Sequence, residues 1–131
     1  LAPSSCLERV RNLQRSGVLR GFHADVAPEA IGVELEAMIA MRLTLHSRKT
    51  LSDFREHLLA QPEVIQVFRT SGANDFLVHV AVPNAAYLHD LTFDRFATRA
   101  ELSHMETAIV FDFDRNWTMP HYRNREDART T

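Results

Sequence analysis

The spacing of apolar residues changes along the chain and separates a short head from a longer body. Between residues 4 and 16, apolar side chains recur at every third position, which predicts one short helix with Gly17 at its end. Apolar residues at 18–22 predict a strand after it. The proline and glycine between residues 27 and 32 indicate a connection, so we expect a boundary near Pro28.

The body shows four stretches in which apolar residues alternate or cluster as they do in β-strands. These strands are predicted over residues 35–45, 64–70, 76–82 and 104–113. The five residues between the second and third strands suit a hairpin.

Two helices are predicted between these strands. The first is capped by Ser47 or Thr50 and ends before Pro62, and the second begins at Pro83 and Asn84. Their inward faces carry Leu51, Phe54, Leu58 and Leu59 in the first, and Leu88, Leu91 and Phe96 in the second. The order is βαββαβ. With right-handed crossovers it gives an α+β fold, a ferredoxin-like four-stranded antiparallel sheet with both helices on one face.

The sheet face without helices is predicted to be apolar. No segment of the chain is left to cover it, and apolar patches of this kind mark interfaces between proteins. We therefore expect a second copy of the chain to cover this face in a homodimer. The expected contact residues are Met38, Ala40, Leu77, Ala108 and Val110, with Ala81 beside them.

Composition narrows the class of protein. The chain has 131 residues, of which 45% are hydrophobic and 24% charged, as in a globular domain with an appendage. The single cysteine, Cys6, cannot form an internal disulfide, so a cytoplasmic location is expected. No apolar run approaches the roughly 20 residues that span a bilayer, so no membrane partner is expected.

Charge is unevenly distributed along the chain. Residues 1–23 hold four arginines and one acid, for a net charge of +3, whereas residues 24–114 hold 7 basic and 14 acidic side chains, for −7. The tail from Arg115 carries +2. A head that contacts a polyanion would show this asymmetry, although four arginines on a solvated helix would show it too.

Local motifs for metal binding or catalysis are lacking in the sequence. The seven histidines are widely separated, at His23, His46, His57, His79, His89, His104 and His121. None of them is spaced as a ligand pair, Cys6 has no nearby base, and no glycine-rich nucleotide motif occurs. We therefore predict no catalytic residues, no metal site and no cofactor.

The first helix resembles the recognition helix and following turn of the Lrp/AsnC family of bacterial and archaeal transcription regulators. The residues that match the family pattern are Leu1, Ser4, Cys6, Arg9, Val10, Leu13, Gln14, Gly17 and Val18. Ala2 stands where the family usually has serine. The similarity continues through the hairpin at 72–75 and reaches about Asp114.

The resemblance implies a winged helix-turn-helix followed by the family's RAM-type ligand-binding domain. Residues 1–28 would be the C-terminal part of the helix-turn-helix with a linker strand, without its first helices. Residues 29–114 would bind the effector and form oligomers, and residues 115–131 would form a C-terminal arm. The implied function is a regulator that binds duplex DNA and whose assembly or DNA affinity responds to a small effector, an amino acid.

The resemblance also assigns roles on the helix. Ser4 and Ser5 would donate to base edges or phosphates, while Arg9 and Arg11 would neutralise phosphates. Arg9 has an alternative role, an ion pair with an acid inside the helix-turn-helix.

The predicted effector site lies at the hairpin. It comprises Gly72, Ala73, Asn74 and Asp75, together with Thr107 on the last strand. Gly72 allows a ligand close to the backbone, and Asp75 would meet the ammonium of an amino acid. Alternatively, Asp75 only satisfies local N–H groups in an Asx-type turn. Asn74 replaces the family's usual aromatic residue, which argues against an aromatic contact to the ligand.

Two other functions remain open at this stage. One is a sirohaem-decarboxylase-like or other dimeric ferredoxin-like enzyme, in which His23, His46 or His104 would serve a tetrapyrrole. The other is an effector-binding module that contacts no DNA.

Overall fold

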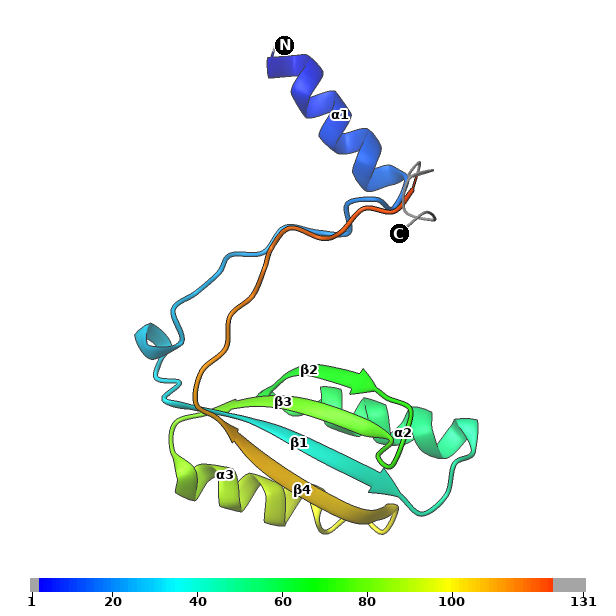
Figure 1. Ribbon diagram of the computed structural model, residues 1–131, viewed down its shortest axis with the longest axis vertical. Helices are drawn as coiled ribbons and strands as arrows, with labels where there is room; N and C mark the ends of the chain where they lie inside the picture. The colour runs from blue at the N-terminus through cyan, green and yellow to red at the C-terminus, as the bar shows by residue number, and fades with distance from the viewer. Residues whose placement is uncertain (1–2, 124–131) are drawn as a thin grey trace, which may run out of the picture. The chain divides into compact units, whose positions relative to one another are not determined.

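The computed structural model describes residues 3–123, which divide between Ile31 and Gly32 into two units. In the first unit, helix α1 (Pro3–Arg15) precedes the 3-10 turn η1 (Pro28–Ile31) (Figure 1). Gly17 adopts a φ of 82° and its N–H donates to the Gln14 carbonyl at 3.1 Å. This left-handed glycine cap ends the helix where the sequence predicted.

The strand predicted at residues 18–22 does not form. Residues 18–27 carry no strand, and the side chains of Val18 and Phe22 are 69% and 67% exposed. A strand needs a neighbouring backbone to pair with, and the described sheet is built entirely from residues between 35 and 110. Apolar composition alone therefore did not suffice to make a strand here.

The second unit is a four-stranded antiparallel sheet in the order β2-β3-β1-β4. Its strands are β1 (Leu35–Leu43), β2 (Val64–Arg69), β3 (Phe76–Val82) and β4 (Leu102–Val110). Its helices are α2 (Arg48–Leu59) and α3 (Ala85–Leu91), the latter continuing into the π-helical turn η2 (Thr92–Phe96). The ferredoxin-like order βαββαβ is thus confirmed (Figure 1).

The outer strands are shorter than the alternation of the sequence suggested. β4 ends at Val110 rather than at residue 113, because Val110 is already opposite Glu36 and β1 begins only one residue earlier. β1 ends at Leu43 rather than at residue 45, next to a register shift between Arg42 and Leu43. Pairing, not side-chain pattern, sets both ends.

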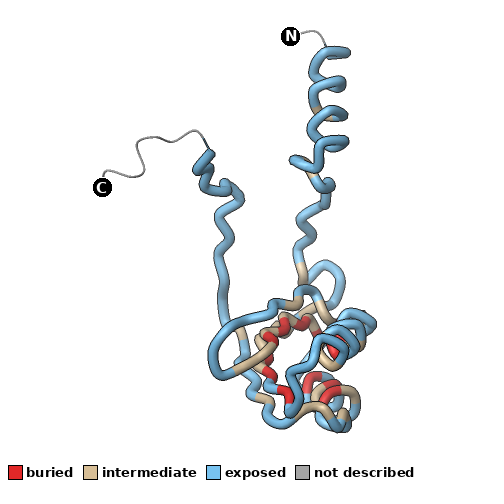
Figure 2. The backbone as a smooth tube through the Cα atoms, turned by 90° about the vertical axis from the view of Figure 1, so that its right-hand side faces the viewer, coloured by how far each residue is buried: buried red, intermediate tan, exposed pale blue. Residues whose placement is uncertain are grey.

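The core lies between the sheet and the two helices (Figure 2). Alternate residues of β1 and β3 meet the inner faces of the helices. The buried residues are Ala37, Ile39, Met41, Leu43, Phe54, Leu58, Phe76, Val78, Val80, Val82, Leu88, Leu91 and Phe96. Leu59, predicted to face inward, is exposed, because it lies about 100° around α2 from the buried Leu58.

Side-chain caps begin both helices. Ser47 is the N-cap of α2, because its Oγ accepts the Thr50 N–H at 3.1 Å. Of the two predicted caps, Ser47 and Thr50, the structure therefore confirms Ser47. Asn84 Oδ1 accepts the Tyr87 N–H at 2.8 Å and begins α3.

A buried carboxylate connects the start of β2 to the helices. Glu63 lies 2.6 Å from Arg95 Nη2 and accepts a hydrogen bond from the Tyr87 hydroxyl at 2.7 Å. Burial alone would raise the pKa of Glu63, but the hydrogen bonds from Arg95 and Tyr87 lower it below its ordinary value. The ion pair holds η2 against the sheet.

Candidate functional site

The β2–β3 hairpin turns beside the end of β1. The Thr70 N–H donates to the Asp75 carbonyl at 3.1 Å, and the Asp75 N–H donates to the Met41 carbonyl at 2.8 Å. Gly72 has a φ of 98°, in the left-handed region that favours glycine. A Cβ at Gly72 would meet nothing within 4 Å, so the space beside this backbone is open.

The Asp75 carboxylate is fixed across strands. Its Oδ2 accepts the Leu43 N–H at 2.7 Å and lies 3.0 Å from His46 Nε2, and the side chain is only 13% exposed. Burial would raise the pKa of Asp75, but the Leu43 N–H and the His46 imidazole lower it, so the group is ionised at neutral pH. All hydrogen bonds of this carboxylate within residues 3–123 go to Oδ2.

The other hairpin residues use their carbonyls within the chain. Arg42 Nε donates to the Ala73 carbonyl at 2.8 Å, and Thr70 Oγ1 donates to the Asn74 carbonyl at 3.2 Å. No hydrogen bond from the backbone N–H groups of Gly72 and Ala73 is found among the described residues. Within the described residues, these two N–H groups of the hairpin are therefore available as donors to a ligand.

Thr107 is not brought to the hairpin within one chain. Thr107 belongs to β4 and lies opposite Ile39 of β1. The hairpin leads into β3, which pairs with the opposite edge of β1. His46 and Arg42, by contrast, contact the hairpin and were not predicted as site residues. The signal was present in the antiparallel pairing of the first and third strands, which brings the end of β1 to the start of β3.

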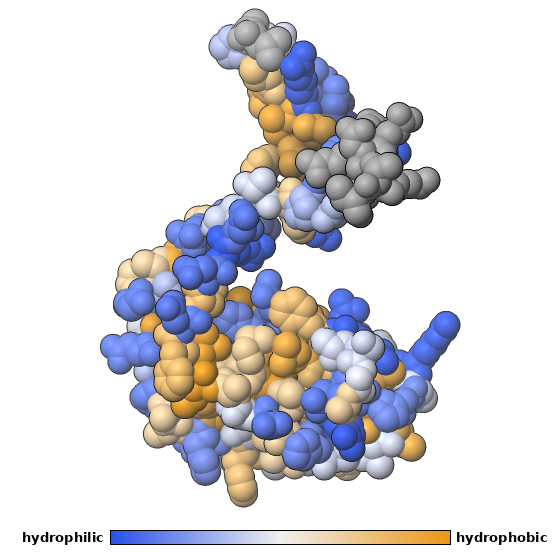
Figure 3. Space-filling view, in the orientation of Figure 1, coloured by the Kyte–Doolittle hydropathy of each residue, from blue (hydrophilic) through white to orange (hydrophobic). Residues whose placement is uncertain are grey.

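The predicted interface residues share the sheet face opposite the helices. In the register, Met38 pairs with Ala108, Ala40 with Leu77 and Glu36 with Val110. They form one continuous surface whose members are half-buried or exposed: Met38, Ala40, Leu77, Ala108 and Val110. We call this surface the open sheet face; Figure 3 shows apolar side chains in patches between polar ones on this unit.

Three further residues of the open sheet face were not predicted from the sequence. Phe68 pairs with Leu77 and is 43% exposed. His79 Nε2 and Glu36 Oε1 lie 2.9 Å apart on neighbouring strands, with both side chains largely covered. Only the register, and not local sequence, shows that these two groups meet.

The segment that follows β4 lies against this face just before the C-terminal arm begins. The Phe113 ring meets the His79 ring edge-on, with centroids 6.1 Å apart. Farther along, Arg115 Cζ lies 4.3 Å from the centre of the Trp117 ring. Part of the arm predicted at 115–131, namely residues 124–131, lies outside the described residues.

The four polar residues predicted on α1 are all exposed. Ser4 and Arg11 are two turns apart on one side of the helix, and Ser5 and Arg9 are one turn apart on another. The two arginines border the apolar stripe of Leu7, Val10 and Leu13, because Arg11 follows Leu7 and Leu13 follows Arg9 by one turn. No residue of α1 is buried within the described chain, and Figure 3 shows apolar side chains exposed on this helix. Among the described residues Glu8 pairs with Arg15, and Arg9 forms no ion pair.

Neither a metal site nor a membrane-spanning helix is present in the part of the chain that the structure describes. No group of three His, Cys, Asp or Glu side chains is arranged to hold a metal ion. No helix has the length and apolar character needed to cross a membrane. His46 is instead engaged by Asp75, and His104 lies opposite Arg42 on the open sheet face.

Comparison with known proteins places this architecture in a family. Residues 36–113 match the model of the Lrp/AsnC ligand binding domain. The chain is 34% identical over 112 residues to the HTH-type transcriptional regulator AldR of Mycolicibacterium smegmatis and 33% identical over 112 residues to AldR of Mycobacterium tuberculosis. Each match covers 86% of this chain. The chain spans 66% of the length of the M. smegmatis protein and 63% of the length of the M. tuberculosis protein.

Two solved structures support the same conclusion at the level of the fold. A transcriptional regulator from Neisseria meningitidis in complex with L-Met has a TM-score of 0.83 and 22% identity, covering 92% of this chain and 78% of that one. A feast or famine regulatory protein from M. tuberculosis, complexed with L-methionine, has a TM-score of 0.75 and 26% identity, with coverage of 92% and 79%. The chain belongs to the Lrp/AsnC family.

Proposed function

We propose that this chain acts in a cytoplasmic transcription regulator, rather than an enzyme, that binds duplex DNA and responds to an amino acid. Family membership supports the regulatory part, since relatives are named as transcriptional regulators. The observation that carries the effector part is the ionised, fixed carboxylate of Asp75 in the same hairpin as the available N–H groups of Gly72 and Ala73. That arrangement offers one partner for each end of a zwitterion.

In this proposal the effector binds at the hairpin. Its carboxylate accepts the N–H groups of Gly72 and Ala73, and its ammonium lies against the remaining oxygen of Asp75. Asn74 lines the turn, and the Thr107 hydroxyl comes from a neighbouring copy. The two solved relatives described above hold methionine, which supports an amino acid as the class of ligand.

Assembly uses the open sheet face. Two copies pack their sheets face to face at about the 10 Å sandwich spacing and bury the apolar surface of both. The contact residues are Met38, Ala40, Leu77, Ala108 and Val110. Binding at a hairpin that lies near a neighbouring dimer then couples the effector to higher assembly, because the ligand contacts both copies.

DNA binding uses α1. Residues 1–28 belong to the winged helix-turn-helix, residues 29–114 to the effector-binding and oligomerisation domain, and residues 115–131 to the arm. Ser4 and Ser5 contact base edges or phosphates, and Arg9 and Arg11 neutralise phosphates. The exposed apolar stripe of α1 supports this assignment, since the other helices of such a motif would cover it.

A thermal-unfolding screen against the twenty amino acids tests the proposal. A ligand that binds only the folded state raises the unfolding temperature, by the equivalent of about 2.7 kcal/mol at a hundred times its dissociation constant. At least one amino acid should stabilise the wild type and fail to stabilise Asp75→Ala. Asp90→Ala, which removes an exposed carboxylate on α3, serves as the control and should respond as wild type. Equal responses of both variants would place the effector elsewhere.

A further inference from the structure

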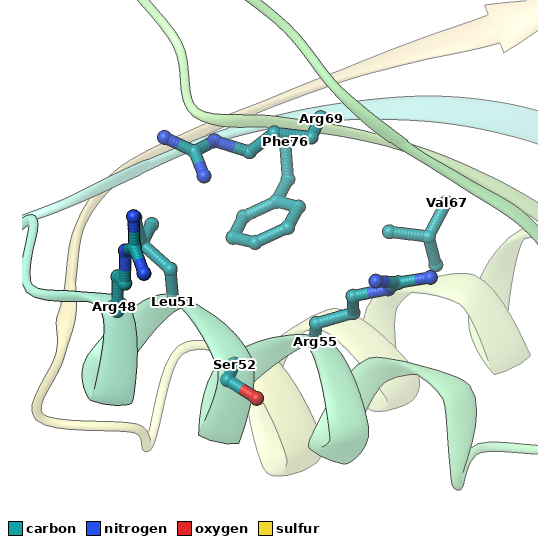
Figure 4. A pocket seen from close by; sticks show the side chains of 7 residues that line it. All are labelled: Arg48, Leu51, Ser52, Arg55, Val67, Arg69 and Phe76. Atoms are coloured by element: carbon teal, nitrogen blue, oxygen red, sulfur yellow. The ribbon is translucent and has the colours of Figure 1, made fainter.

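A hollow lies on the helix-bearing side of the sheet, between α2 and the outer strand β2. It encloses about 400 Å³, within the usual range for small-molecule sites. α2 contributes Arg48, Leu51, Ser52 and Arg55, and the strands contribute Val67, Arg69 and Phe76. Figure 4 shows the Phe76 ring near the centre of this arginine pocket, with the three guanidinium groups around it.

The arginine pocket concentrates positive charge, and none of the residues that line it is acidic. Arg48 and Arg55 lie two turns apart on α2 and Arg69 faces them from β2, and no Asp or Glu is among the lining residues. Within the described residues none of the three forms an ion pair. Lys49, on another side of the same helix, is paired with Asp53 at 2.9 Å. Three unpaired like charges around one hollow repel each other, and a bound anion relieves that repulsion.

The wall behind the charges is apolar. Phe76 is buried, Leu51 and Val67 are half-buried, and all three line the hollow. Arg69 Cζ lies 5.9 Å from the centre of the Phe76 ring, which keeps its guanidinium over the apolar wall. A ligand that fits this surface therefore combines an oxyanion with an apolar group.

The lining also discriminates against zwitterions. An amino acid would bring its ammonium among three guanidinium groups with no carboxylate to receive it, whereas the hairpin offers Asp75 for that purpose. Arg69 acts on Asp75 through its charge, so the two sites are neighbours with opposite preferences.

We propose that the arginine pocket binds a small organic anion that carries an apolar side chain and no ammonium group, such as a 2-oxo acid. Its carboxylate takes the guanidinium groups, with the Ser52 hydroxyl beside them, and its side chain packs on Leu51, Val67 and Phe76. This site is separate from the amino-acid site proposed at the hairpin. A phosphate group would satisfy the same guanidinium groups, and the experiment distinguishes the two oxyanions.

Calorimetric titration of the chain with 4-methyl-2-oxopentanoate, leucine and inorganic phosphate tests this inference. The oxo acid should bind, and Arg48→Gln and Arg55→Gln should each weaken binding by about tenfold. Lys49→Gln removes the same charge from another side of α2 and should leave binding unchanged. The side chains of Arg48, Lys49 and Arg55 are all exposed, so the three variants should keep the wild-type circular dichroism spectrum.

The leucine and phosphate arms decide the class of ligand. In the Asp75→Ala background, where the hairpin cannot contribute, leucine should bind at least tenfold more weakly than the oxo acid, and so should phosphate. Undiminished binding in the Arg48→Gln/Arg55→Gln double variant, or an equal loss in Lys49→Gln, would overturn the site. Phosphate or leucine binding as tightly as the oxo acid would overturn the proposed ligand class, and failure of the oxo acid to bind would overturn both.

Discussion

Asp75 Oδ2 accepts the backbone N–H of Leu43 at 2.7 Å, which joins the β2–β3 hairpin to the end of β1. The bond extends the connection between β1 and β3 beyond Met41 and Phe76, the last residues paired in their register. It also explains how a hairpin carboxylate stays ionised although its side chain is largely covered. One residue thus fixes the hairpin and supplies the charge on which the proposed effector site depends.

Removing the Asp75 side chain should destabilise the fold. Asp75→Ala leaves the half-buried Leu43 N–H without its acceptor, which costs about 1 to 3 kcal/mol. Asp75→Asn keeps an acceptor oxygen and should cost less. Urea unfolding measures both, with Asp90→Ala expected within about 0.5 kcal/mol of wild type. If Asp75→Ala is as stable as Asp90→Ala, the bond does not stabilise the fold.

Stability should fall in acid because of Glu63 and Asp75. Both folded pKa values are lowered, so each carboxylate stabilises the fold fully above its ordinary pKa, 4.5 for Glu63 and 3.8 for Asp75. That contribution is lost as the pH falls through the lowered folded values. The urea midpoint should therefore drop below about pH 4.5, and Glu63→Gln should flatten the profile. A Glu63→Gln profile as steep as that of wild type would show that Glu63 does not drive the loss.

A charge on the open sheet face should separate the proposed dimer. Ala40 lies between Leu77 and Glu106, so Ala40→Glu adds a second carboxylate to an apolar contact. Sedimentation should find a dimer for wild type at micromolar concentration and a monomer for Ala40→Glu, with unchanged circular dichroism. Ala60→Glu makes the same change at the exposed end of α2 and should stay dimeric. A monomeric wild type would contradict the proposed interface.

The arginines of α1 should contribute to DNA affinity in a regulator with a complete helix-turn-helix. Arg11→Ala should lower the slope of log affinity against log salt by about one unit, because one phosphate contact is lost. Arg48→Ala, in the other unit, should leave the slope unchanged. For Arg9→Ala, weaker binding by a folded variant indicates a phosphate contact, and loss of cooperative unfolding indicates the structural ion pair. An unaltered slope in Arg11→Ala would remove Arg11 from the interface.

The sequence predicted the elements whose burial repeats regularly. Buried residues alternate with half-buried or exposed ones along β1 and β3. The buried residues of the helices, among them Phe54, Leu58 and Leu88, recur about once a turn or every second turn. The fold could therefore be predicted from periodicity. The strand at 18–22 failed because pairing is not local: nothing in those residues says whether a partner strand exists. The premature end of β4 at Val110 has the same origin.

The candidate site was predictable only in part, for the same physical reason. The glycine turn and the Asp75 carboxylate carry a local signal. The partners of Asp75 are the Leu43 N–H at the end of β1 and His46 in the connection after it, about thirty residues away, and they meet Asp75 only once the strands pair. The His79–Glu36 pair and the arginine pocket likewise join distant segments, so no local motif marks them.

Sedimentation velocity with and without the stabilising amino acid tests the central claim most directly, since the proposal couples effector binding at the hairpin to assembly. The amino acid should shift the sedimentation coefficient of wild type and of Asp90→Ala, and it should leave that of Asp75→Ala unchanged. An equal shift in Asp75→Ala, or no shift in wild type at saturating amino acid, would contradict the account.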